Sequence, residues 1–208
     1  MKKIIAMAVA TICLVSASFA LDLEFGARAF LGRDLDLDTD LRTNYATAKD
    51  DKTFDFGFGG YGNFALFGGL GIQAEVNYVK SSTVFQAEGK QDIPYEMHVM
   101  DLSPMVWLNL DLWKLTIGFG AGPNFSILVG SAGDVVKASK QDFDMGLIAG
   151  ADFKFYFTDH LGLVLSGRYV MDFEREEIDV YGVNTGVSKY DPSRKTVYGG
   201  LGIEWKLF

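Results

Sequence analysis

The sequence predicts an all-β protein: a closed, eight-stranded, antiparallel up-and-down barrel that spans a membrane. Three observations predict this fold class. The chain of 208 residues has 24 glycines and 17 phenylalanines but only 4 prolines, a composition that suits strands better than helices. Eight segments alternate apolar and other residues with a period of two. The connections between these segments alternate between short and long.

The charge composition excludes several classes of protein. Charged residues make up 22% of the chain and hydrophobic residues 49%, which is too apolar for a disordered chain and too polar for a bundle of membrane helices. The 27 acidic residues outnumber the 19 basic ones, giving a net charge of -8, and no basic block occurs. We therefore expect no nucleic-acid partner.

Residues 1–20 are predicted to be a cleaved export signal. Lys2 and Lys3 precede a short apolar run, and small residues then provide a cleavage site after Ala20. A membrane anchor is disfavoured because a spanning helix needs roughly 20 apolar residues. A lipoprotein signal at Cys13 is disfavoured because the residues before that cysteine fit such a signal poorly.

The predicted mature chain, residues 21–208, forms a single barrel domain. It retains 17 basic and 27 acidic residues, a net charge of -10, and it contains no cysteine. It therefore has neither a disulfide nor a thiolate nucleophile.

The first four predicted strands cover residues 21–31, 54–66, 72–78 and 101–108. A period of two places apolar side chains on one face of a strand, because successive residues point to opposite faces. These side chains are Leu21, Leu23, Phe25, Ala27, Ala29 and Leu31, then Phe54, Phe56, Phe58, Phe64 and Leu66, then Ile72, Ala74, Val76 and Tyr78, then Leu102, Pro104, Val106 and Leu108. The fourth strand is the weakest, because a proline has no amide donor and residues 95–100 do not alternate cleanly.

The last four predicted strands cover residues 115–125, 143–155, 161–173 and 197–207. Their apolar faces are formed by Leu115, Ile117, Phe119, Ala121 and Phe125, by Phe143, Met145, Leu147, Ala149, Ala151, Phe153 and Phe155, by Leu161, Leu163, Leu165, Tyr169, Met171 and Phe173, and by Val197, Leu201, Ile203, Trp205 and Leu207. Eight is an even number, and each segment is close to the roughly 9–11 residues that a tilted strand needs to cross a bilayer.

The connections predict two unlike ends of the barrel. Short turns are expected at residues 67–70, 109–111 and 158–160, and long loops at residues 33–53, 80–94, 128–141 and 174–195. Outer-membrane barrels have short periplasmic turns and long extracellular loops. We therefore expect both ends of the mature chain at the periplasmic rim and all four long loops outside.

The distribution of aromatic residues separates a membrane barrel from a soluble, lipocalin-like one. A soluble barrel would be apolar inside and rich in Lys and Glu outside, whereas the polar face here carries mostly Gly, Ser and Asn with charges of both signs. Two aromatic bands lie on the apolar face, one near the short turns (Phe64, Trp113, Phe155, Phe157 and Trp205) and one near the long loops (Phe54, Phe56, Phe125, Phe143, Tyr169 and Phe173). Bilayer interfaces favour this arrangement, so we expect the apolar face to contact lipid.

With its signal peptide, eight amphipathic strands, three short turns and four long loops, the chain resembles the small outer-membrane barrels of the OmpX, opacity-protein and OmpW type. The resemblance covers the whole mature chain and rests on architecture. It implies a location in the outer membrane and insertion by the outer-membrane assembly machinery. It also implies that the last strand is the assembly signal, carried here by Ile203, Trp205, Leu207 and Phe208, although Phe208 is out of phase with the other three.

Charged residues on the inward face are expected to form ion pairs, because an eight-stranded barrel is just wide enough to be filled by side chains. Arg28, Glu75, Asp101 and Arg168 fall at similar depths. We expect Arg168 to pair with an acid on the opposite wall, with Glu75 as first choice and Asp101 as second. The alternative is a narrow polar path, for which inward glycines at 118, 120, 122, 146, 150, 200 and 202 would leave space.

Two motifs resemble ligand sites without matching them. Acidic residues alternate along Asp34, Asp36, Asp38 and Asp40, but the glycine and the closing glutamate of a calcium loop are replaced by Thr39 and Tyr45. We interpret them as an acidic rim on a strand that rises above the membrane, and we expect no metal site. Glycines at 57, 59 and 62 have the spacing of a dinucleotide fingerprint, but no helix follows.

Catalysis is not expected, and neither is a cofactor. The mature chain has only two histidines, His98 and His160, and the His-x-Ser element of barrel deacylases is absent. The sequence favours a structural and surface-interaction role, in which the extracellular loops contact surface ligands or host molecules. A narrow channel for small or apolar solutes, as in the OmpW type, is the alternative, and a lipid-modifying enzyme is the least favoured.

Overall fold

The structure is a computed structural model that describes residues 23–35, 46–49, 54–67, 69–87, 93–132, 136–137, 143–173, 178–180, 188–190 and 194–207. The predicted signal segment, three of the four rim aspartates (Asp36, Asp38 and Asp40) and Phe208 lie outside these residues.

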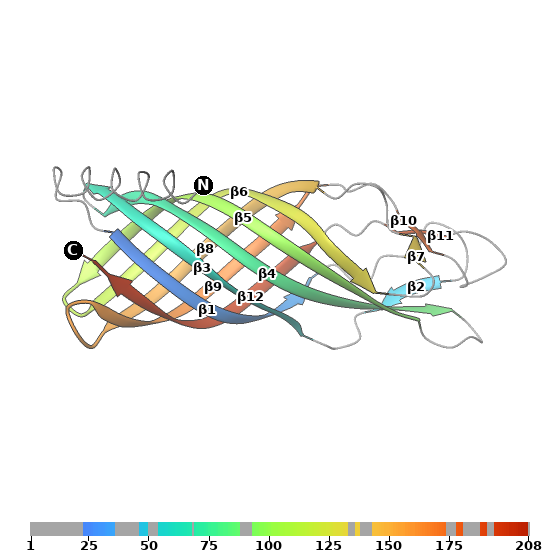
Figure 1. Cartoon of the computed structure of the whole chain (residues 1–208), viewed down its shortest axis with the longest axis horizontal. Helices are drawn as coiled ribbons and strands as arrows, with labels where there is room; N and C mark the ends of the chain where they lie inside the picture. The colour runs from blue at the N-terminus through green and yellow to red at the C-terminus, as the bar shows by residue number, and fades with distance from the viewer. Residues whose placement is uncertain are drawn as a thin grey trace, which may run out of the picture.

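Eight long antiparallel strands form the barrel (Figure 1). They are β1 (Leu23–Asp34), β3 (Asp55–Phe67), β4 (Leu70–Ala87), β5 (Ile93–Leu112), β6 (Leu115–Ala132), β8 (Phe143–Tyr156), β9 (Leu161–Asp172) and β12 (Lys195–Lys206). Each strand pairs with its sequence neighbour, β1 pairs with β12, and a β4–β5 ladder completes the ring. The predicted closed up-and-down barrel is therefore confirmed.

Four short strands belong to the long connections. Strand β2 (Ala46–Lys49) pairs with the end of β4. Strands β7 (Val136–Lys137), β10 (Ile178–Val180) and β11 (Ser188–Tyr190) form a small separate sheet. All four lie beyond the long-loop end of the barrel (Figure 1).

Three strands are much longer than their sequence pattern predicts. Strands β4, β5 and β6 have 18, 20 and 18 residues, whereas β1, β9 and β12 have 12 each. The prediction of a loop over residues 80–94 is wrong for most of its length, because β4 and β5 remain paired as far as Phe85 and Ile93. Likewise, residues 128–132 of the predicted loop at 128–141 belong to β6. In these extensions the strands remain paired although apolar and polar residues do not alternate cleanly.

The fourth predicted strand forms despite its proline. Pro104 pairs with Ala74 of β4, but the ladder between β5 and β6 is interrupted between Leu102 and Val106. Pro104 has no amide hydrogen to donate, and it lies in the part of β5 that forms no ladder with β6.

One of the three predicted short turns is misplaced. Strand β5 continues through residues 109–111 to Leu112, and the reversal occurs at Trp113 and Lys114. Trp113 adopts a positive φ of 60° and is 92% exposed. The turn between β3 and β4 contains Gly69 at a φ of 80°, a conformation that glycine adopts without strain.

The two faces of the barrel wall are divided as predicted, except that Leu23, predicted on the apolar outer face, is only 7% exposed. Aromatic residues of both predicted bands, such as Phe54, Phe143, Phe155 and Trp205, are exposed on the outside, as are the aliphatic residues between them. Charged and polar residues of the other parity are buried in the lumen. Among the described residues, no helix is long and apolar enough to cross a membrane.

Candidate functional site

The lumen contains a central ion cluster formed by Arg28, Glu75, Asp152 and Arg168, from strands β1, β4, β8 and β9. Arg168 reaches across the lumen to Glu75, with 2.7 Å between Nη2 and Oε1, and it also contacts Asp152, with 2.6 Å between Nη1 and Oδ1. Nη2 of Arg28 donates to the other oxygen of Glu75. The two bases and two acids of this cluster balance in charge, which offsets part of the cost of burying them.

Amide side chains complete the environment of the central carboxylate. Nε2 of Gln73 lies 2.7 Å from Oε1 of Glu75, and Nδ2 of Asn77 lies 3.2 Å from Oε2. Glu75 is fully buried. Such a carboxylate is stable inside a barrel only when donors surround it.

A second ion cluster lies toward the short-turn end. Nζ of Lys154 is held between Glu24 at 2.7 Å and Glu204 at 2.8 Å. The hydroxyls of Tyr61 and Tyr156 both donate to Glu204. In this layer, one ammonium is shared by two carboxylates, and neutral side chains donate to the carboxylate oxygens as well.

A third ion cluster lies toward the long-loop end, around Arg194. Its guanidinium lies 2.9 Å from Oδ1 of Asp101 and 2.7 Å from Oδ2 of Asp172, and Nη2 also donates to Ser126 at 2.8 Å. Burial alone would lower the pKa of Arg194, but the neighbouring carboxylates outweigh it and hold that pKa well above its ordinary value. Asp101, the second acid expected for Arg168, is thus placed with Arg194.

Arg194 is the lumen residue that the sequence pattern missed. It directly precedes β12, outside the stretch in which residues alternate. Its position after a long connection suggested a loop residue, yet it is 1% exposed. A residue that enters the lumen from beyond the end of a strand takes no part in the alternation of apolar and polar residues, so the sequence pattern does not identify it.

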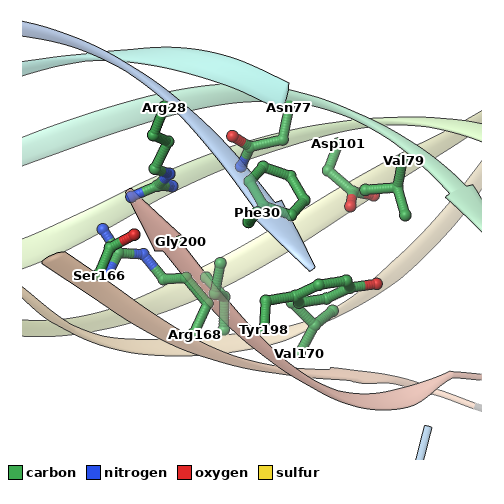
Figure 2. Close-up of a pocket in the computed structure, with 11 residues that line it drawn as sticks. Arg28, Phe30, Asn77, Val79, Asp101, Ser166, Arg168, Val170, Tyr198 and Gly200 are labelled. Carbon is green, nitrogen blue, oxygen red and sulfur yellow. The ribbon is translucent and has the colours of Figure 1, made fainter. Parts of the chain in front are cut away.

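Apolar side chains separate the central and outer ion clusters. Phe30 and Tyr198 pack edge to face with ring centroids 5.3 Å apart, and Val79, Ile148 and Val170 lie around them. Figure 2 shows this pocket, with Arg28 and Arg168 on one side of it and the rings of Phe30 and Tyr198 on the other. The lumen is therefore layered, with apolar packing between ionic layers.

Large side chains occupy the space above three of the inward glycines that were expected to leave room, Gly118, Gly120 and Gly150. A Cβ at Gly118 would lie 2.5 Å from Nε1 of Trp107, and one at Gly120 would lie 2.3 Å from Cε3 of the same ring. A Cβ at Gly150 would lie 2.7 Å from Cδ of Arg168. Trp107 is fully buried, and the Arg168 guanidinium carbon lies 5.0 Å from the centroid of its ring.

The remaining predicted residues lie away from these clusters. Asp34 ends β1, where its carboxylate accepts a bond of 2.7 Å from Oγ1 of Thr196. Ile203, Trp205 and Leu207 are exposed on the outer face of the last strand. No group of three Asp, Glu, His or Cys side chains in the described part of the chain is arranged as a metal centre.

Comparison with known proteins gives the family. Residues 7–190 match the family model described as the outer membrane protein beta-barrel domain. The chain belongs to this outer-membrane β-barrel family. Its members lie in the outer membrane, so the exposed apolar belt of this barrel contacts the lipid bilayer there. None of the curated proteins shows significant sequence similarity to the chain.

Solved outer-membrane barrels share the fold. OprG from Pseudomonas aeruginosa is 12% identical, with a TM-score of 0.68 over 90% of this chain and 95% of that chain. Outer membrane protein W from E. coli is 11% identical, with a TM-score of 0.45 over 88% and 97% of the two chains. Ail, the attachment invasion locus protein of Yersinia pestis, is 12% identical, with a TM-score of 0.44 over 90% and 97%. At these identities the likeness concerns the barrel fold alone.

Proposed function

We propose that this outer-membrane barrel is a non-conducting protein that acts through its extracellular surface, in adhesion or ligand contact. The observation that supports this proposal is the series of three buried ion clusters across the lumen. Their central ions, Arg168, Lys154 and Arg194, are each at most 6% exposed. Opening a water path past one of them would separate buried ion pairs, at about 3–5 kcal/mol for each partner left unpaired.

An extended wall supports a role outside the lumen. We define the extended wall as residues 81–87 of β4, 93–99 of β5 and 128–132 of β6. They lie beyond the last residues that pair with β3 and β8, Lys80 and Ile127. Seven residues of β4 extend the sheet by roughly 20 Å along the strand. In Figure 1, β4 and β5 extend past the other barrel strands on the side of the long loops.

The described histidines favour a non-enzymatic protein. Nδ1 of His98 lies 2.5 Å from the hydroxyl of Tyr78, and the two rings stack with centroids 5.9 Å apart. His160 stacks on Trp205 at the short-turn end, with centroids 6.1 Å apart. A serine, threonine or cysteine nucleophile needs a base within reach, and in the described residues neither ring bonds to such a side chain.

Planar-bilayer conductance and an adhesion assay together test the proposal. The intact protein should show no unit conductance, and a stable conductance would overturn the non-conducting assignment. For adhesion, an Asn-Gly turn should replace residues 82–96 and join Ser81 to Met97, which face each other in the β4–β5 ladder. Cells that display this shortened barrel should bind host-cell surfaces less than the parent. Trp113→Ser, at a short turn, is the matched control, and equal binding by the shortened barrel would contradict the surface role.

The apolar pocket favours a second candidate function, the passage of small apolar solutes. The pocket has an apolar wall formed by Phe30, Val79, Ile148 and Val170. Such a wall would contact an apolar solute favourably but would not stabilise an ion. Uptake of a small apolar solute into proteoliposomes separates this candidate from the first. Uptake above that of protein-free liposomes, without ion conductance, would favour solute passage over the adhesion or ligand-contact role.

A further inference from the structure

Basic side chains gather on the outer face of the barrel at its long-loop end. Among the described residues of the eight barrel strands, the outward-facing ionisable side chains there are Arg33, Lys80, His98 and Lys195, with Glu96 as the acid. The chain as a whole has a net charge of -8, so a mainly basic outer face at this end runs against the overall composition. We call Arg33, Lys80, His98 and Lys195 the basic collar.

The strand register places the collar residues in two neighbouring pairs. His98 is directly opposite Lys80 in the ladder between β4 and β5. Lys195 and Arg33 lie one diagonal step apart in the ladder between β12 and β1. Only β3 separates the two pairs, and its outward residue beside Lys80 is the uncharged Phe56. Like charges on facing residues are destabilising, and an anion bound between them removes that cost.

Lys80 and His98 keep hydrogen-bond donors for a ligand outside the wall. Nζ of Lys80 lies 2.9 Å from Oε1 of Glu96, and both side chains are 39% exposed. An ammonium has three donors, and this ion pair does not use them all. Nδ1 of His98 lies 2.5 Å from the hydroxyl of Tyr78. When that hydroxyl donates to Nδ1, the ring hydrogen of a neutral histidine is on Nε2, which has no hydrogen-bond partner in the described part of the chain.

Aromatic rings place this pair at the height of the lipid headgroups. Phe56, Phe58, Tyr78 and His98 form a continuous series on the outer face, with successive ring centroids 6.4, 5.2 and 5.9 Å apart. Aromatic belts mark the membrane–water interfaces of outer-membrane barrels. Lys80 is paired with Phe56, at the last rung that joins β4 to β3. The pair therefore lies where the closed wall ends, between the apolar belt and the tip of the extended wall.

We propose that the basic collar binds the phosphate-bearing headgroup of an anionic lipid in the outer leaflet, with Lys80 and His98 as its main contacts. Basic side chains beside a bilayer attract anionic lipids, and charge-assisted hydrogen bonds to phosphate are short and strong. A lipid fits this surface better than a soluble anion, because the rings of Phe58 and Tyr78 offer its acyl chains an apolar surface beside the collar. Such a lipid would be held whether or not the extracellular surface is adhesive.

Native mass spectrometry of the purified protein in detergent tests the site, with diphosphorylated lipid A as the probe. The same lipid with its phosphates removed is the reference, and the parent should retain the phosphorylated form preferentially. Lys80→Gln combined with His98→Gln should weaken the apparent affinity about tenfold, because two phosphate contacts are lost. Lys114→Gln combined with His160→Gln, at the short-turn end, is the matched control and should bind like the parent. Lys80→Arg keeps the charge and should keep the affinity.

A second measurement separates lost binding from altered folding. A half-exposed ion pair adds little stability, so the Lys80→Gln, His98→Gln variant should unfold at the parent's temperature in detergent without lipid. Lipid A should then raise the unfolding midpoint of the parent more than that of the variant. Equal retention of the two lipids by the parent, or parent-like affinity in the double variant, would overturn the proposal. Displacement of the lipid by an equal concentration of inorganic phosphate would also overturn it, and would assign the collar to a soluble anion.

Discussion

Arg168 and Glu75 meet across the lumen of the barrel, with 2.7 Å between Nη2 and Oε1, although 93 residues separate them in the chain. Their strands, β9 and β4, lie on opposite sides of the eight-stranded ring. Arg28 binds the second oxygen of the same carboxylate. One glutamate therefore links three strands through two guanidinium groups, which makes it the central residue of the lumen.

We predict strong energetic coupling between these two residues. Glu75→Gln and Arg168→Met should each cost about 3–5 kcal/mol of unfolding free energy, because each leaves a buried charge without its partner. The double variant should cost much less than the sum of the single ones. Urea unfolding in lipid vesicles, analysed as a double-mutant cycle, measures this coupling.

Arg168→Lys provides an internal control for the same cycle. Lysine keeps the charge but lacks the planar fork that engages Glu75 and Asp152 together. Its cost should lie between those of the parent and Arg168→Met. Coupling near zero, with each single change tolerated, would mean that the lumen is hydrated and would favour a channel.

A second prediction concerns the lipid-facing surface. Leu147 and Leu165 are 46% and 57% exposed on the outside of β8 and β9, and Ile117 shares their outward parity on β6. Replacing any of the three by Arg should cost about 2–4 kcal/mol of folding stability near the bilayer midplane. Val129→Arg, on the extended wall, is the matched control and should cost about 0–1 kcal/mol. Equal costs at all four positions would contradict the assignment of Ile117, Leu147 and Leu165 to the bilayer and of Val129 to the wall outside it.

A third prediction fixes the orientation of the barrel. The only cysteine, Cys13, lies in the predicted signal, so single cysteines can be placed on a cysteine-free background. A membrane-impermeant maleimide should label Val129→Cys on intact cells. It should label Trp113→Cys, at the opposite end, only after the outer membrane is permeabilised. The reverse pattern would mean that the long loops face the periplasm.

A fourth prediction tests the packing around Trp107. Gly120→Val should cost about 1–3 kcal/mol of stability, because its side chain would overlap both the indole ring and the carbonyl oxygen of Val106. Gly199→Val is the matched control, since a Cβ at Gly199 meets nothing within 4 Å, and it should be tolerated. Combining Gly120→Val with Trp107→Leu should restore part of the loss in a thermal melt. Without such rescue, the cost would not arise from contact with the indole.

Local pattern was sufficient to predict the barrel wall. A period of two requires no knowledge of neighbouring strands, because the backbone itself sends successive side chains to opposite faces. The outward position of Phe143 and the inward position of Glu75 follow from parity alone. Strand ends were predicted less well, because the pairing of β4 with β5 persists beyond the alternating segment, from Ser81 to Phe85.

The sequence by itself thus determined the strand number, the two faces, the membrane environment and the inward position of charges on alternating strands, such as Glu75 and Arg168. Only the tertiary structure decided which charges meet, because tilt and stagger set the height at which each strand presents its side chains. Asp101 was a reasonable partner for Arg168 by parity, but the stagger places it beside Arg194. Arg194 lies outside the alternating segments, so the sequence pattern did not identify it. Likewise, Asp55 and Tyr198 come to lie on either side of Gly32 only once the first and last strands close the ring.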